Sequence, residues 1–233
     1  MGKNLIQQAR GKGGPRYRSP SFRFRGKVSF ARTDAEGVVR DILDCPGHHA
    51  PLMHVEYPDK TTALLVAPEG ISVGDRVGSD PQTWDRGHVL KLTDIPAGIP
   101  IFNIESAPGD GGKFCRTSGV FAKIVAKSNE SITIQLPSKK NRVFNPDCRA
   151  SIGVIAGAGR PEKPFLKAGK KHFQMKSKNK LYPRSSACKM NAVDHPYGNK
   201  RSARKAKQKP VNRFTPPGRK VGKLWPRRTG RKK

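Results

Sequence analysis

The sequence predicts a mainly β protein in which two small barrels lie between extended basic arms. Short apolar runs bounded by Pro, Gly and Asp recur between residues 28 and 160, with the length and alternation of strands. Helix signals are nearly absent. The chain has a net charge of +30, yet residues 29–162 hold fifteen basic and sixteen acidic residues, and residues 163–233 hold twenty-four basic residues and one acid. The middle therefore resembles an ordinary soluble domain, while the polycationic ends predict a polyanionic partner.

Residues 1–28 are interpreted as a basic N-terminal extension. They hold eight Lys and Arg residues and no acid, and Gly, Pro and Ser interrupt any helical period. Tyr17, Phe22 and Phe24 alternate with arginines. Basic side chains contact phosphates, and aromatic rings stack on unpaired bases. We therefore expect this arm to contact RNA or DNA; the alternative is a disordered tail with incidental aromatic residues.

Residues 29–83 have the pattern of a five-stranded oligonucleotide-binding (OB) barrel. The runs VSFAR, VVRDILD, LMHVEY and TALLVA are the expected strands, and residues 58–61 are the expected hairpin turn between the last two. Residues 70–78 are expected to close the barrel.

Residues 84–160 have the pattern of an SH3-like barrel. The expected strands are the runs HVLKL, PIFNIE, GVFAKIVAK, ITIQLP, RVFN and RASIGVIAG. Because each barrel is small, we expect the two to pack together or to gain part of their stability from RNA.

Residues 161–233 are interpreted as an extended basic tail. Large aliphatic residues are few after Pro161, so the tail cannot bury enough apolar surface to offset the entropy of ordering it. A free polycation of this length would repel itself, which makes phosphate contact the favoured interpretation over a merely solvated segment.

Several patterns that suggest enzyme or metal chemistry fail on inspection. The segment APGDGGKF at 107–114 lacks the first Gly and the Ser or Thr of a phosphate loop. The cluster Cys45, His48, His49 and His54 has no standard metal-ligand spacing, and no CxxC pair occurs. We therefore expect no metal, no cofactor, reduced thiols and a cytoplasmic protein. No apolar stretch is long enough for a membrane helix, and no secretory signal is seen.

The neighbouring residues Asp194 and His195 are the remaining catalytic candidates. A catalytic triad needs a nucleophile on one side of the His and an acid on the other, a geometry that sequence neighbours rarely achieve. Pro196 favours an extended or turn conformation at His195. We expect Asp194 to accept backbone hydrogen bonds in an Asx-type turn, with Asp194 and Pro196 shaping the loop and His195 presented outward to RNA.

The sequence resembles the universal large-subunit ribosomal protein two family in its archaeal form. The stretches that carry the resemblance run in order along nearly the whole chain: RSPSFRFRGKV, DILDCPGHHAPLMHVEY, GHVLKLTDIPAGIPIFNIESAPGDGGKF, IQLPS, NPDCRASIGVIAGAGRPEKPFLKAGKKH, MNAVDHPYG and PPGRKVGKLWPRRTGR. One departure is that Gly198 is followed by Asn199, Lys200 and Arg201, where the family has further glycines.

The resemblance implies a structural constituent of the large ribosomal subunit that binds its rRNA and is not an enzyme. It implies an OB barrel, an SH3-like barrel and a tail threaded into rRNA near the peptidyl-transferase region. The implied partners are large-subunit rRNA, neighbouring ribosomal proteins and the small subunit across the interface, with no membrane and no homo-oligomer. Two rival hypotheses stay open: a DNA-coating, chromatin-like protein, and an enzyme that uses Asp194 and His195.

The expected RNA contacts are mostly basic residues of the two arms, together with loops such as 108–116 and 190–200. They are Arg16, Arg18, Arg23, Arg25, Lys113, Arg116, Arg149, Lys167, Lys170, Lys171, Arg184, Lys189, Asn191, His195, Gly198, Lys200, Arg201, Arg219, Lys220, Arg227 and Arg228.

Overall fold

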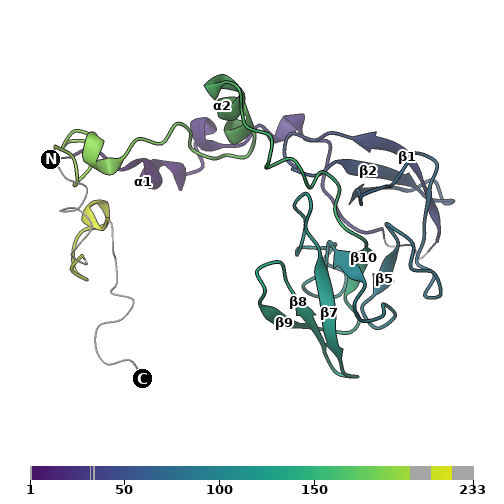
Figure 1. Ribbon diagram of the computed structural model, residues 1–233. Helices are drawn as coiled ribbons and strands as arrows, with labels where there is room; N and C mark the ends of the chain where they lie inside the picture. Colours follow the sequence, from purple (N-terminus) through teal and green to yellow (C-terminus); the bar gives the residue numbers. More distant parts are fainter. Residues whose placement is uncertain (1, 32, 34, 200–210, 222–233) are drawn as a thin grey trace. The chain divides into compact units, whose positions relative to one another are not determined.

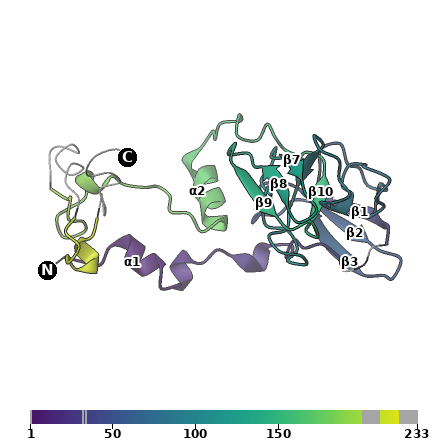
Figure 2. The ribbon, with the colours of Figure 1, turned by 90° about the horizontal axis from the view of Figure 1, so that it is seen from below.

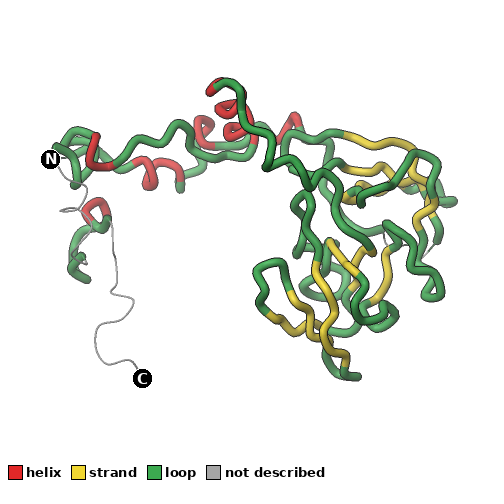
Figure 3. Tube along the Cα trace, in the orientation of Figure 1, coloured by secondary structure: helices red, strands yellow, loops and turns green. Residues whose placement is uncertain are grey.

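Two antiparallel sheets carry the strands of the described residues. The computed structural model describes residues 2–31, 33, 35–199 and 211–221. By internal contacts the chain divides into two units: residues 21–166, called here the barrel unit, and residues 1–20 with 167–233, called the terminal unit. Each unit is described by itself. Figure 3 shows the strands in yellow, and those of both sheets fall within residues 21–166.

The first sheet has the strand order β3-β2-β1-β4. Its strands are β1 (Gly37–Leu43), β2 (Leu52–Glu56), β3 (Thr62–Val66) and β4 (Arg76–Val77). The β2–β3 hairpin turns where the sequence predicts. There, the Asp59 carboxylate accepts bonds from the Thr61 N–H and hydroxyl at 3.0 and 2.6 Å. Residues 28–32 were expected to form a further strand, but no strand is present in their described part, where the Ser29 N–H donates to the Leu64 carbonyl oxygen at 3.3 Å.

The second sheet has the strand order β5-β10-β6-β7-β8-β9. Its strands are β5 (Val89–Lys91), β6 (Pro100–Phe102), β7 (Ala122–Lys127), β8 (Ile132–Gln135), β9 (Asn141–Phe144) and β10 (Arg149–Ile152). Each lies within a run that the sequence predicts as a strand or within one residue of it. A register shift in β7 between Ile124 and Ala126, like the one in β1 between Val39 and Asp41, bends the strand, as bulges do. Figures 1 and 2 show both sheets curling.

The two sheets of the barrel unit share an apolar cluster. Leu52 of the first sheet and Phe102 of the second are both fully buried in it, together with Ile155 and Val28. Backbone bonds reinforce the contact, because the Glu69 N–H donates to the Val154 carbonyl oxygen at 2.8 Å. Burial of one such side chain stabilises the fold by about 1.5–3 kcal/mol, so the barrels support one another.

The position of Val28 explains where the barrel unit begins. Val28 is 2% exposed, and Phe24 packs against the same cluster, so residues 21–28 make their contacts within the barrel unit. Along the sequence, the boundaries between the two units lie after residues 20 and 166. The domain boundaries at 28/29, 83/84 and 160/161 stay a prediction.

Short helices interrupt the arms that the sequence predicts as extended. They are α1 (Ile6–Arg10), α2 (Ala168–Ser177) and the 3₁₀ turns η1 (Pro15–Tyr17), η2 (Ser21–Arg23), η3 (Ala187–Lys189) and η4 (Pro217–Arg219). The ten-residue α2 has no buried residue, so it needs no apolar face and its sequence shows no amphipathic pattern. It also has no side-chain N-cap hydrogen bond. In the described ranges, no helix is long and apolar enough to cross a membrane.

Candidate nucleic-acid interface

The glycine-rich loop after β6 is held by two carboxylates. Glu105 is fully buried and accepts hydrogen bonds from the N–H groups of Gly109, Gly111 and Arg149 at 3.2, 3.1 and 2.9 Å. Asp110 accepts bonds from the backbone of Ser106, Ala107 and Gly112 at 3.0–3.2 Å. Hydrogen bonds to these two carboxylates therefore order the loop. The loop also carries two basic side chains that were expected to bind RNA.

These two cations are Lys113 and Arg116. The Lys113 ammonium lies 3.0 Å from the Asp110 carboxylate and its side chain is 60% exposed. Burial opposes ionisation of Asp110, but the hydrogen bonds from Lys113 and the backbone outweigh it and lower the pKa of that carboxyl. The Arg116 guanidinium donates to the Gly112 carbonyl oxygen at 3.2 Å, and burial lowers its pKa. Both were expected to bind RNA, and that role stays a prediction.

Arg149, another expected RNA contact, also makes several contacts within the barrel unit. Its guanidinium donates to the Ala31 carbonyl oxygen at 2.8 Å and to Glu105 at 3.3 Å, and it lies 5.3 Å from the Phe30 ring centroid. These two hydrogen bonds use two of the guanidinium's five N–H donors and fasten the start of the first barrel to the second sheet. The RNA contact expected of Arg149 stays a prediction.

The arginines expected as RNA contacts in the N-terminal arm are all exposed. They are Arg16, Arg18, Arg23 and Arg25. The Arg16 guanidinium lies 6.0 Å from the Tyr17 ring centroid, and that of Arg23 lies 5.6 Å from the ring centroid of Phe22, which is 83% exposed. Such pairs present a charge and an aromatic face together, as single-stranded nucleic acid requires.

The loop that contains Asp194 and His195 is closed by its own backbone. The N–H groups of Asp194 and His195 both donate to the Asn191 carbonyl oxygen, at 3.0 and 3.2 Å, and the Asn199 N–H donates to that of Met190 at 3.0 Å. Gly198 packs so closely against Asn191 that a Cβ atom there would collide with the Asn191 carbonyl group. Gly198 is therefore required by the loop itself, whether or not RNA approaches it.

His195, and not Asp194, accepts the hydrogen bond that shapes the turn. The Tyr197 N–H donates to His195 Nδ1 at 3.0 Å, so the neutral ring carries its proton on Nε2. Partial burial lowers the pKa of His195, which favours this neutral form. Among the described residues, no group accepts a hydrogen bond from Nε2–H of the half-buried ring, so this donor could serve a phosphate, ribose or base.

Asp194 does not form the expected Asx-type turn. Among the described residues, no backbone N–H donates to its carboxylate, and its partner is the Lys3 ammonium at 3.7 Å. The Lys3 N–H also donates to the Val193 carbonyl oxygen at 2.8 Å. Asp194 therefore helps to fasten the chain start to the loop, through an exposed and individually weak ion pair. The described contacts include no hydrogen bond donated by the His195 ring to the Asp194 carboxylate, which a catalytic dyad needs.

Of the remaining expected contacts that the structure describes, all except Lys171 are exposed. The Lys171 ammonium lies 5.3 Å from the Tyr182 ring centroid. The exposed ones are Lys167, Lys170, Arg184, Lys189, Asn191, Arg219 and Lys220. Four lie outside the described residues: Lys200, Arg201, Arg227 and Arg228. The RNA contacts of these residues stay a prediction.

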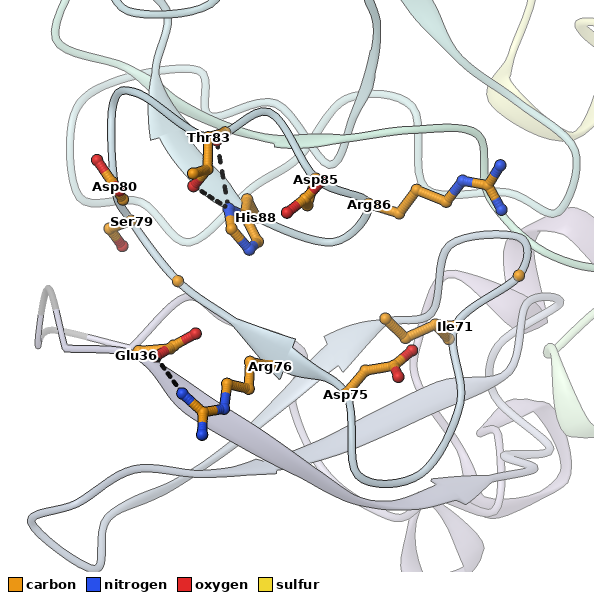
Figure 4. Close-up of a pocket in the computed structure, with 12 residues that line it drawn as sticks. Glu36, Ile71, Asp75, Arg76, Ser79, Asp80, Thr83, Asp85, Arg86 and His88 are labelled. Atoms are coloured by element: carbon orange, nitrogen blue, oxygen red, sulfur yellow. Dashed lines mark hydrogen bonds and ion pairs between the residues drawn. The ribbon is translucent and has the colours of Figure 1, made fainter.

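A cavity of about 730 Å³ beside β4 has the wrong charge for an RNA site. Figure 4 shows the Glu36–Arg76 ion pair on one side and His88, bonded to Thr83, on the other. Its charged lining consists of Glu36, Asp75, Asp80, Asp85, Arg76 and Arg86. Four carboxylates against two guanidiniums repel phosphate, so this cavity is not where the basic chain binds a polyanion.

In the cysteine–histidine cluster, Cys45 and His48 lie in a turn, with His48 Nδ1 3.2 Å from Cys45 Sγ, whereas His54 lies in β2. Within the described part of the chain, no three His, Cys, Asp or Glu side chains gather as a metal-binding group. Burial raises the pKa of the Cys115 thiol to about 11, which makes it a poor nucleophile.

Glu105 is the site residue that the sequence reasoning missed. It is an acid at the end of an apolar run and six residues before Gly111 of the Gly111–Gly112 pair. A carboxylate close to a glycine-rich turn can accept hydrogen bonds from backbone N–H groups of the turn that have no other partner. An acid at this distance from two consecutive glycines is the sequence signal that could have identified Glu105.

Residues 85–215 match the family model described as Ribosomal Proteins L2, C-terminal domain. The matched region contains the second sheet, α2 and the loop of His195, and it spans more than half of the chain. The chain belongs to the ribosomal protein L2 family. For an L2-family protein, the two curled antiparallel sheets agree with the OB barrel and SH3-like barrel that the sequence predicts, and the mainly β fold class is confirmed.

Curated L2-family relatives match over the full length. Large ribosomal subunit protein uL2 of Methanococcus vannielii is 47% identical over 240 residues, covering 100% of both chains. The protein of the same name from Methanococcus maripaludis strain C6 is 46% identical, with the same coverage. The resemblance to the archaeal form of the family is thereby confirmed.

Proposed function

We propose that this chain is a structural constituent of the large ribosomal subunit in the cytoplasm and binds large-subunit rRNA. The observation that carries the proposal is its end-to-end similarity to relatives named large ribosomal subunit protein uL2. The charge distribution supports it. The terminal unit holds twenty-eight Lys and Arg residues and one acid, whereas the barrel unit holds nineteen and sixteen. Phosphate binding therefore belongs mainly to the terminal unit.

We further propose that the barrels support subunit association and that the tail supports the RNA fold around the peptidyl-transferase region. Besides rRNA, its partners would then be neighbouring ribosomal proteins and the small subunit across the interface. Lys113, Arg116 and the exposed basic residues of the arms would hold phosphates, which sets position without reading sequence.

Sedimentation of a cell lysate tests the proposal. We expect the chain to sediment with large subunits after DNase treatment, and to bind naked large-subunit rRNA with an affinity that falls about 10³- to 10⁵-fold between 50 and 200 mM salt, as for about six to ten phosphate contacts. A peak that moves with DNA would favour the chromatin-like alternative. Salt-independent RNA binding would contradict the electrostatic mechanism.

We propose that His195 contacts RNA and is not a catalytic group. Subunits with His195→Ala should assemble but translate poorly, and His195→Gln should restore part of the activity because it supplies a neutral N–H donor. Normal translation by the His195→Ala particles would remove His195 from the functional residues. Turnover by the isolated chain that His195→Ala abolishes would instead indicate an enzyme.

A further inference from the structure

A second cavity, in the terminal unit, has walls from two distant stretches of sequence. It measures about 340 Å³ and is lined by residues within 10–18 and 172–182. The Arg10 guanidinium donates to the Asn179 carbonyl oxygen at 3.0 Å and joins the walls. Figure 2 shows the purple N-terminal segment beside the green segment that carries α2. The cavity is therefore part of the fold of this unit and not a gap between units.

The charged groups that line this cavity have one sign. They are Arg10, Arg16, Arg18, Lys176 and Lys180, with His172 beside them, and no acid lines it. In contrast, the cavity beside β4 has four carboxylates. A concave surface with only positive charges concentrates the field and attracts an anion.

Two tyrosines give the cavity aromatic faces. Tyr17 and Tyr182 both line it and are half-buried, one from each wall. Cations lie near both rings, Arg16 at 6.0 Å and Lys171 at 5.3 Å from the centroids. Neither phenol hydroxyl has a hydrogen-bond partner within the described ranges. Aromatic faces with free hydroxyls suit a planar base, whereas a phosphate alone would need only the cations.

We propose that this cavity receives one unstacked nucleotide of the RNA, with its base against Tyr17 or Tyr182 and its phosphate against the surrounding arginines and lysines. This inference rests on the proposed rRNA binding. The volume lies at the lower end of the range of about 300–1,000 Å³ for small-ligand sites, so a single nucleotide fits and a duplex does not.

Three RNA hairpins that differ at one position test the proposal with the full chain. One carries a single unpaired adenosine in its stem, the second carries an abasic ribose there, and the third is fully paired. Fluorescence anisotropy is measured in excess unlabelled paired duplex, which occupies the general phosphate sites. We expect the unpaired adenosine to bind about 5- to 150-fold more tightly than either other hairpin, the range that stacking of one base on an aromatic ring contributes.

Tyr17→Leu and Tyr182→Leu keep apolar bulk but remove the ring, and should abolish the preference for the unpaired adenosine. Phe173→Leu is the matched control, because Phe173 is a 69% exposed aromatic residue of α2 that does not line the cavity. The control should keep the full preference. Equal affinity for the three hairpins, or an unchanged preference in both tyrosine variants, overturns the proposal.

The outcomes separate this inference from the proposed function. Salt-sensitive binding with no preference among the hairpins overturns the nucleotide site alone. Salt-insensitive binding to all three contradicts the rRNA-binding function as well. Ultraviolet cross-linking of the wild-type complex with the adenosine hairpin is a second readout that needs no variant. Mass spectrometry should find the nucleotide on residues 10–18 or 172–182, and adducts found only elsewhere overturn the site.

Discussion

At the scale of single residues, Glu105 is a fully buried carboxylate that connects the glycine-rich loop to Arg149. Glu105→Gln keeps the shape but replaces one acceptor oxygen by an N–H₂ donor. We expect the free energy of unfolding to fall by about 1–3 kcal/mol, because buried donors lose their acceptor. Urea unfolding followed by circular dichroism measures the change.

Glu69→Gln is the matched control for Glu105→Gln. Glu69 is exposed and its carboxylate has no hydrogen bond or ion pair among the described residues, so the change should stay within about 0.5 kcal/mol. Equal stability of the two variants would show that Glu105 does not order the loop.

A second prediction concerns Gly198, because the Asn191 backbone occupies the space that a Cβ atom at position 198 would need. Gly198→Ala should open the loop, and the amide protons of Tyr197 and Asn199 should exchange faster. Gly169→Ala in α2 meets open space and should instead stabilise its helix by about 0.5–1 kcal/mol. Unchanged exchange in Gly198→Ala would mean that the loop accommodates a side chain.

His195 gives a prediction about pH. Its pKa is lowered in the folded chain by partial burial, so protonation opposes the closed loop. The loop's stability is therefore complete above the unfolded-state pKa of about 6.5 and declines as the pH falls below it. An NMR titration of the ring should give a lower pKa than the same ring in urea. A pKa equal to or above the urea value would contradict the closed turn.

The same loop shows how far sequence reasoning reaches at this scale. A turn at residues 194–198 could be predicted, because Asp, Pro and Gly have local conformational preferences. The identity of the acceptor could not. The His195 ring accepts the Tyr197 N–H, whereas the Asp194 carboxylate pairs with Lys3, which lies 191 positions earlier in the sequence and gives no local signal.

At the scale of elements, the strands were predicted well because alternation and turn residues are local properties. The β2–β3 hairpin is an example, with Lys60 in the left-handed region at φ 60° and Asp59 accepting bonds across the turn. In contrast, α2 escaped prediction. Its ten residues have no capping side chain and no buried face, so no apolar period marks them.

The helix α2 should depend on the RNA for its stability. At ten residues it is shorter than the roughly 12–15 residues at which isolated helices become stable, and Lys170, Lys171 and Lys176 repel one another. Phosphates relieve that repulsion. We expect amide exchange across α2 to slow when large-subunit rRNA is added, and exchange in the strand β8 to stay the same. Equal protection with and without RNA would show that the helix is self-sufficient.

At the scale of the whole molecule, the net positive charge and the apolar core lie in different units, and both change at similar positions along the chain. Among the described residues, the largest fully buried side chains belong to the barrel unit, and the charge excess belongs to the terminal unit. Composition predicts this division. It cannot predict that residues 1–20 fold with residues 167–233, because contacts such as Arg10 with Asn179 join positions 169 apart.

The division predicts that residues 21–166 fold without the rest of the chain. This fragment keeps both sheets and their shared apolar cluster but loses twenty-eight of the forty-seven basic residues. We expect a soluble fragment with cooperative urea unfolding, whose affinity for rRNA falls on the order of a hundredfold at about 0.1 M salt, with a shallower salt slope. A fragment of residues 1–166 is the control, because it restores only the N-terminal arm and should recover a small part of the affinity. An unfolded 21–166 fragment would show that the barrels need the terminal unit, and undiminished affinity would place the phosphate contacts on the barrels.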